Sequence, residues 1–72
     1  MEIIIYNIRK EPTIIITNED EIIIMILIKL HEIIGIDIET IKLIYHNQEL
    51  DHNKTIKFYG IKNNDFLFIV KK

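Results

Sequence analysis

The chain contains no cysteine, no serine and no alanine, and only two glycines and one proline. Without cysteine it can form neither a disulfide framework nor a thiolate zinc site. Without serine or cysteine, the Ser/His/Asp and Cys/His arrangements of nucleophilic catalysis are excluded as well. The two glycines, Gly35 and Gly60, lie far apart in the sequence. There is therefore no glycine-rich loop of the kind that binds phosphate groups.

Length and charge narrow the class of protein further. Seventy-two residues suffice for one small domain. The formal net charge of −2 argues against a nucleic-acid binder, which normally carries a basic stripe. The longest apolar run, residues 22–28, is too short to cross a membrane, and the first residues do not resemble a secretory leader. Since the lack of cysteine fits a reducing compartment, we expect a cytoplasmic or nuclear protein without membrane or nucleic-acid partners.

Isoleucine supplies most of the apolar character. It accounts for 21 of the 72 residues, against one valine and no alanine. Residue types with AT-rich codons, such as isoleucine, lysine and asparagine, are common, whereas alanine, glycine, proline and arginine, with GC-rich codons, are rare. We interpret this bias as the mark of an AT-rich genome rather than of selection for isoleucine. A surface isoleucine is therefore not by itself a sign of a binding site.

Five segments have the pattern of β-strands. Residues 3–8 and 13–17 are β-branched stretches on either side of a loop of about four residues, which predicts a hairpin with Pro12 at its turn or margin. Residues 41–45, 48–50 and 66–70 predict three more strands. Asparagine tolerates positive φ, so His46-Asn47 and Asn63-Asn64 are predicted turns.

The segment that precedes Gly35 has the periodicity of a helix. Asn18 and Glu21 resemble a capping box, and the acidic residues 19–21 suit the positive end of a helix dipole. About 15 residues then follow without glycine or proline up to Gly35, a natural C-cap. One apolar stripe is predicted to face the core, formed by Ile23, Ile26, Leu27, Leu30 and Ile34. The predicted element order is β-β-α-β-β-β.

The titratable residues indicate no catalytic or metal site. His31, His46 and His52 lack the spacing of metal ligands. Asp51 and Asp65 are interpreted as loop and turn residues, and the Asp-Thr-Gly or Asp-Ser-Gly loop of an aspartic protease is absent. We therefore expect no catalytic residue, no metal and no cofactor in this chain. With catalytic and metal sites set aside, the domain is expected to function by binding other molecules.

The whole chain resembles ubiquitin in its element order, in Gly35-Ile36 after the helix and in Leu43-Ile44-Tyr45 on the third strand. The resemblance implies an α+β, β-grasp fold, with a mixed sheet of four to five strands packed on one helix. Residues shared at matching positions include Met1, Ile3, Ile23, Lys29, Gly35, Ile36, Leu43, Ile44, Leu50, Thr55, Tyr59, Ile61, Leu67 and Val70. The family's buried positions are filled here by Ile3, Ile5, Ile15, Ile23, Ile26, Leu30, Leu43, Leu50, Ile56, Ile61, Leu67 and Ile69, which the periodicity also places inside.

Departures from ubiquitin indicate a domain that is not conjugated to other proteins. Ubiquitin ends in an Arg-Gly-Gly tail, whereas this chain ends in Lys71-Lys72. Of ubiquitin's chain-building lysines only Lys29 remains; the other positions hold Tyr6, Glu11, Leu27, Ile33, Gln48 and Asn63. The resemblance also implies that a Lys–Asp pair of ubiquitin is replaced here by Leu27 and His52, so we expect Leu27 in the core and His52 largely solvated. Residues 1–72 are expected to be a single ubiquitin-like domain at the N-terminal end of a longer protein.

Two short motifs carry a narrower resemblance. The run Ile5-Tyr6 with Arg9-Lys10, and the run of residues 59–65, resemble the DNA-damage-inducible shuttle family. That resemblance implies a parent protein with a retropepsin-like aspartic endopeptidase outside this chain. Residues 43–45 and the Leu50-Asp51 step also resemble ubiquilin-type shuttles, which are the nearest alternative. A ubiquitin-type modifier whose Gly-Gly tail is missing and a purely structural scaffold remain further alternatives.

The resemblance also implies a docking patch on the sheet. Carried over by position, this patch consists of Ile8, Ile44, Phe68 and Val70, with Lys42 and His46 as its polar rim. Its expected partners are proteasomal ubiquitin receptors or the helices of ubiquitin-interacting motifs. The alternative is that these residues merely lie on a moderately exposed sheet, since exposed apolar residues are common.

Alternation along the strands predicts a wider apolar face as well. Besides Ile44 and Val70, the side of the sheet away from the helix would carry Ile4, Tyr6, Ile14, Ile16, Phe66 and Phe68. Such a face exceeds what is usual for a monomer, so we expect self-association or a contact with the rest of the parent protein.

Overall fold

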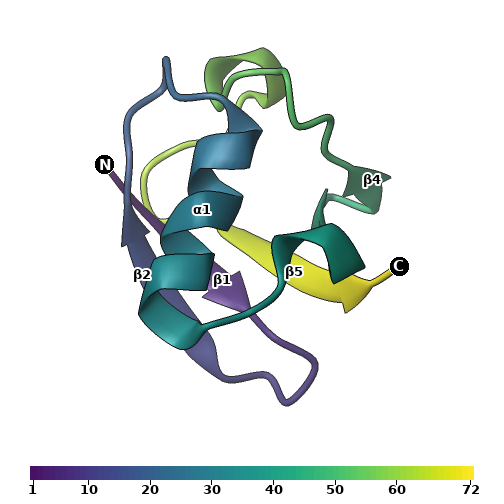
Figure 1. Ribbon diagram of the computed structural model, residues 1–72. Helices are drawn as coiled ribbons and strands as arrows, with labels where there is room; N and C mark the ends of the chain where they lie inside the picture. Colours follow the sequence, from purple (N-terminus) through teal and green to yellow (C-terminus); the bar gives the residue numbers. More distant parts are fainter.

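The computed structural model describes residues 1–72 and contains one α-helix and five strands, in the predicted order (Figure 1). The elements are β1 (Glu2–Tyr6), β2 (Pro12–Ile16), α1 (Ile23–Ile34), β3 (Ile41–Tyr45), β4 (Gln48–Glu49) and β5 (Phe66–Lys71). Two short 3-10 helices, η1 (Ile38–Thr40) and η2 (Lys57–Tyr59), lie in the connections. The first strand ends at Tyr6, two residues earlier than predicted, and residues 7–11 form the hairpin loop. No helix is long and apolar enough to span a membrane.

The sheet has the strand order β2-β1-β5-β3-β4. The first and last strands, β1 and β5, pair in parallel at its centre, and all other neighbours pair antiparallel. Helix α1 crosses one face of this sheet, as Figure 1 shows. The predicted α+β, β-grasp fold with a mixed sheet on one helix is confirmed.

The core lies between α1 and the inner face of the sheet, because alternate residues of each strand point toward the helix. Fifteen buried apolar residues form one cluster, and it contains all twelve residues that fill the family's buried positions. Leu27 is fully buried, as expected. Ile41 and Tyr45 also belong to the cluster although they were not predicted to. His52 is half-buried rather than largely solvated, since its backbone meets the start of α1.

The predicted capping box is wrong. Helix α1 begins at Ile23, and no side chain caps its first turn. The side chain of Asn18 instead accepts a hydrogen bond from the backbone N–H of Asp20, which forms a local turn. The acidic residues at 19–21 therefore precede the helix and do not lie in its first turn.

Tertiary contacts replace the cap. The backbone N–H of Ile23 donates to the carbonyl of Lys54 at 2.8 Å, and that of Ile24 donates to the carbonyl of His52 at 3.1 Å. These bonds satisfy two of the donors that every helix leaves unpaired at its N-terminus. The start of α1 thus depends on a loop some 30 residues further along the chain.

The other end of the helix is as predicted, with one exception. Gly35 adopts the left-handed conformation, with φ of 70°, and its N–H donates to the carbonyl of His31. Ile34, predicted to face the core, is 43% exposed. It borders an open hollow that Pro12 and Ile36 also line, because the last turn of α1 lies beside the hairpin loop rather than over the core.

Candidate protein-binding surface

The side of the sheet opposite α1, here called the outer face, carries apolar side chains on four of its five strands. Strand register places them in rows across the sheet. One row runs Pro12–Tyr6–Phe68–Ile44–Glu49, from β2 to β4. A second row, Ile14–Ile4–Phe66, lies beside the first. The outer face is therefore continuous from β2 to β3, with charge at its β4 end.

An aromatic cluster occupies the centre of the outer face. The rings of Tyr6 and Phe66 meet edge to face with centroids 6.0 Å apart, and those of Phe66 and Phe68 do so at 5.6 Å. The centroids of Tyr6 and Phe68 are also 6.0 Å apart. The two edge-to-face contacts suit the quadrupoles of the rings, and the three side chains contact one another. The centre of the face is thus aromatic as well as apolar.

Four of the six predicted docking residues form one block on β3 and β5. Ile44 pairs with Phe68, and Lys42 pairs with Val70. All four side chains point away from the core, since Leu43 and Ile69 between them are buried. The structure therefore brings Lys42, Ile44, Phe68 and Val70 together.

The other two predicted residues, Ile8 and His46, lie in turns at the margin of this block. Ile8 is in the loop after β1 and is 71% exposed. Strands β1 and β5 run parallel and Tyr6 pairs with Phe68, so the chain continues from Tyr6 in the direction of Val70. Ile8 itself forms no strand pair with β5. His46 follows Ile44 in the turn after β3 and stacks on the ring of Tyr45 at 4.0 Å.

One residue of the rim was missed by the sequence analysis. Glu49 pairs with Ile44 in register, and its carboxylate lies 3.6 Å from the ammonium group of Lys42. The signal was present in the sequence, because a two-residue turn at His46-Asn47 places residue 49 opposite residue 44. The rim therefore contains a surface ion pair rather than an isolated lysine.

A half-buried hydrogen bond connects the segments that carry the block. The hydroxyl of Tyr45 donates to the carboxylate of Asp65 at 2.7 Å, and the backbone N–H of Lys62 donates to the same oxygen at 2.9 Å. The Lys62 N–H and the Tyr45 hydroxyl lower the pKa of Asp65 below its ordinary value. The hydrogen bond to that carboxylate, together with burial, raises the pKa of Tyr45. This contact joins the end of β3 to the turn before β5.

The side chain of Lys29 is also held in place. The ammonium group of Lys29 donates to the carbonyl of Ile16 at 2.8 Å and pairs with the carboxylate of Glu21. Hydrogen bonds from Lys29 and from the hydroxyl of Thr17 lower the pKa of Glu21. Lys29 thus ties α1 to the end of β2.

The three histidines do not line a common surface pocket. The larger pocket, of about 570 Å³, is open and mostly polar; it is lined by Glu49, Leu50, Asp51, His52, Asn53 and Lys72. His31 instead contacts the carbonyl of Ile36 at the end of α1, and His46 stacks on Tyr45. No group of three or more histidine, cysteine or acidic side chains lies close enough to hold a metal ion.

Comparison with known proteins agrees with this architecture. The sequence model of the ubiquitin family matches residues 18–72, which include α1, β3, β4 and β5. The match covers five of the six predicted docking residues, and only Ile8 lies outside it. A search of curated proteins found no match. Since the family model covers more than half of the sequence and the fold is a β-grasp, the chain belongs to the ubiquitin family.

Proposed function

We propose that this chain is a non-conjugated ubiquitin-like domain that docks on proteasomal ubiquitin receptors or on helices of the ubiquitin-interacting type. Membership of the ubiquitin family gives the domain a role in protein interaction or modification, and such domains are generally non-catalytic. The proposal that the domain docks on such receptors or helices is supported by the pairing of Ile44 with Phe68 on the side of the sheet that α1 leaves uncovered.

An amphipathic helix fits the geometry of this block. Ile44 and Phe68 lie in one row, and Val70 lies two residues further along β5, roughly 7 Å away. Apolar residues spaced three to four apart on a helix recur every 5–6 Å or so, so two or three of them can contact these side chains at once. The Lys42–Glu49 pair leaves little net charge at the rim. A partner helix therefore needs an apolar stripe with mixed charges beside it.

The parent protein is proposed from the sequence motifs. We propose a shuttle of the DNA-damage-inducible type, whose remaining part would be an aspartic endopeptidase, with a ubiquilin-type shuttle as the second candidate. A ubiquitin-type modifier is the third. It would require a Gly-Gly pair soon after Lys72. Of ubiquitin's chain-building positions only the one at Lys29 still holds a lysine, and that side chain is held by Ile16 and Glu21. The sequence that follows Lys72 in the gene distinguishes the three.

Heteronuclear NMR titration with a peptide helix of the ubiquitin-interacting type tests the docking proposal. Shifts are expected to cluster on residues 42–46 and 66–71. Ile44→Ala should weaken binding by about 1–3 kcal/mol, as truncations at the centre of an interface do. Ile33→Ala is the matched control, because Ile33 is exposed on α1, away from the outer face. Shifts centred elsewhere, or no binding at millimolar peptide, would contradict the proposal.

A further inference from the structure

The outer face extends well beyond the docking block, toward the β2 edge of the sheet. Ile14 and Ile16 on β2 are 57% and 64% exposed, and Phe66 on β5 is 51% exposed. Ile4 and Tyr6 lie between these strands and are half-buried. Helix α1 covers only the opposite side, so no element of this chain shields these side chains (Figure 1). We propose that this surface is covered by the same surface of a second copy, in a two-fold symmetric dimer with sheet packed on sheet.

The area of the face is sufficient for such a dimer. A half-exposed phenylalanine still presents about 100 Å² to solvent, because a whole aromatic side chain covers roughly 150–250 Å². The eight apolar side chains of the outer face together present roughly 500–600 Å², at the upper end of the largest apolar patch on a typical soluble monomer, and such patches are often functional. Joining two copies would remove about 1,000–1,200 Å² of apolar surface, which reaches the size of a specific interface before the polar rim is counted.

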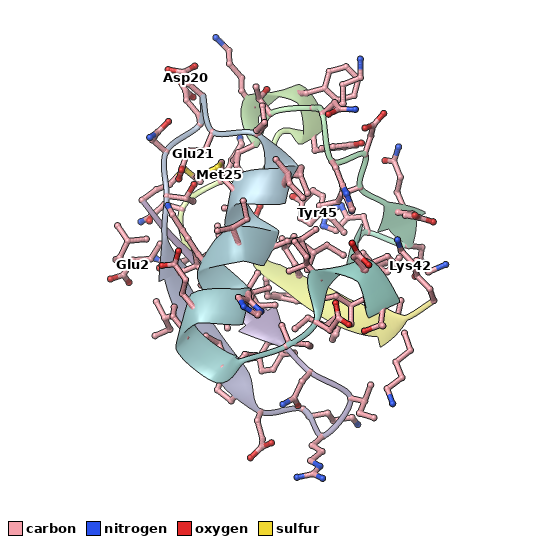
Figure 2. The ribbon with its side chains drawn as sticks, in the orientation of Figure 1. Glu2, Asp20, Glu21, Met25, Lys42 and Tyr45 are labelled. Carbon is pink, nitrogen blue, oxygen red and sulfur yellow. The ribbon has the colours of Figure 1, made fainter.

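The charges of the outer face lie at two of its corners. One corner carries Glu2, at the start of β1, and the other carries Lys42, which pairs with Val70 near the end of β5, together with Glu49, whose carboxylate lies 3.6 Å from the ammonium group of Lys42. Figure 2 shows Glu2 and Lys42 on opposite sides of the molecule. A two-fold axis lying in the interface, near Phe66 and Phe68, brings Glu2 of one copy toward Lys42 of the other, twice. In this isologous arrangement each Glu2 faces the Lys42–Glu49 pair of the other copy, so Lys42 lies between two acidic side chains.

The edges of the sheet are poor alternatives for association. The β2 edge begins with Pro12, which has no N–H to donate, and the β4 edge is only two residues long. Short edge strands and proline discourage edge-to-edge pairing. Face-to-face packing of two sheets, with their strands roughly aligned, is a common alternative. The aromatic cluster of Tyr6, Phe66 and Phe68 would lie at the centre of that interface, where aromatic side chains contribute most to binding.

Sedimentation velocity of the 72-residue chain tests the dimer. Protein concentrations from about 1 μM to 1 mM cover dissociation constants from moderate to weak. The apparent mass should rise from 8.6 kDa toward twice that value. Ile14→Glu should weaken dimerisation at least tenfold, whereas Ile33→Glu should leave it unchanged. Ile33, on α1, is the matched control because it is 58% exposed, against 57% for Ile14. A chain that remains monomeric at 1 mM, or equal effects of both variants, would overturn the proposal.

A charge exchange tests the two-fold geometry. Glu2→Lys and Lys42→Glu, each made in a Glu49→Gln background that removes the ion pair within one copy, should each weaken the dimer several-fold, because each places like charges opposite one another. The double variant should recover most of the loss. Failure of the double variant to associate more tightly than the single variants would show that Glu2 and Lys42 do not meet. Lys42 belongs to the docking block, but Ile14 and Glu2 lie outside it and no helix peptide is present in these measurements, so a failure of the dimer proposal is distinguishable from a failure of the helix-docking proposal.

Discussion

Replacement of Leu27 by lysine should remove a large part of the stability of the domain at neutral pH. Leu27 is fully buried on α1. It lies three residues after Ile24, whose N–H donates to the backbone carbonyl of His52. Position 52 is therefore next to the helix, but it carries an imidazole and not a carboxylate. A lysine at position 27 would place an ammonium group in an apolar environment without an acidic partner.

The magnitude follows from the cost of burying that charge. Full burial lowers the pKa of a lysine by up to 3–5 units, and at pH 7 the cost of neutralising a group with an unfolded pKa of about 10.4 is about 4–5 kcal/mol. A 72-residue domain has a total stability of roughly 4–11 kcal/mol, so the variant is expected to lose a large part of its stability at pH 7. Leu27→Met, which changes the volume little, should cost less than about 1.5 kcal/mol.

Urea denaturation followed by circular dichroism measures these differences at pH 7 and pH 10. The folded pKa of the new lysine lies below its unfolded value of about 10.4, so the unfolded state binds more protons between the two values. The stability of Leu27→Lys relative to the wild type must then rise from pH 7 to pH 10. Adding His52→Asp should restore part of the loss at pH 7 by supplying a partner. An unchanged midpoint at pH 7, or a deficit independent of pH, would refute this reasoning.

Three further changes test other parts of the structure, each by chemical denaturation. Tyr45→Phe should cost about 0.5–1.5 kcal/mol at pH 7. The hydrogen bond holds the pKa of Asp65 low, so this deficit should shrink as the pH falls below about 4, where the carboxylate of the unfolded chain becomes protonated. Gly35→Ala should cost about 1 kcal/mol through its positive φ alone, because no atom lies within 4 Å of the new Cβ, and D-alanine at the same position should cost nothing. Leu43→Ala should cost about 2–5 kcal/mol, whereas Ile44→Ala, on the outer face, should cost less than about 1.5.

The sequence predicted the strands and the core because both depend on local periodicity. A residue that follows a buried one in a strand must face the opposite side, so burial of Leu43 and Ile69 fixes the outward direction of Ile44, Phe68 and Val70. The C-terminus of the helix was also predictable, since Gly35 is favoured where φ must be positive. These features need no information from distant parts of the chain.

The start of the helix could not be predicted in this way. Asn18 and Glu21 have the residue types of a capping box, but the donors of Ile23 and Ile24 are satisfied by carbonyls of a distant loop. Only the tertiary structure brings that loop to the helix, and it leaves Asn18 free to form its own turn. The position of Ile8 in the docking patch could not be predicted from local pattern either. It depends on where β1 ends and not on the alternation of apolar residues along the strand.

The helix-docking and dimer proposals use the same side chains and therefore constrain one another. Ile44 and Phe68 lie in the docking block and also in the row that runs across the outer face to Tyr6. A helix bound there would block the second copy. Helix binding and dimerisation are therefore negatively coupled, and each must weaken the other by the same factor. Only the monomeric fraction can bind a helix, and the apparent affinity falls in proportion to that fraction. Ile14→Glu, outside the block, should therefore strengthen helix binding at high protein concentration, whereas Ile44→Ala should weaken both events.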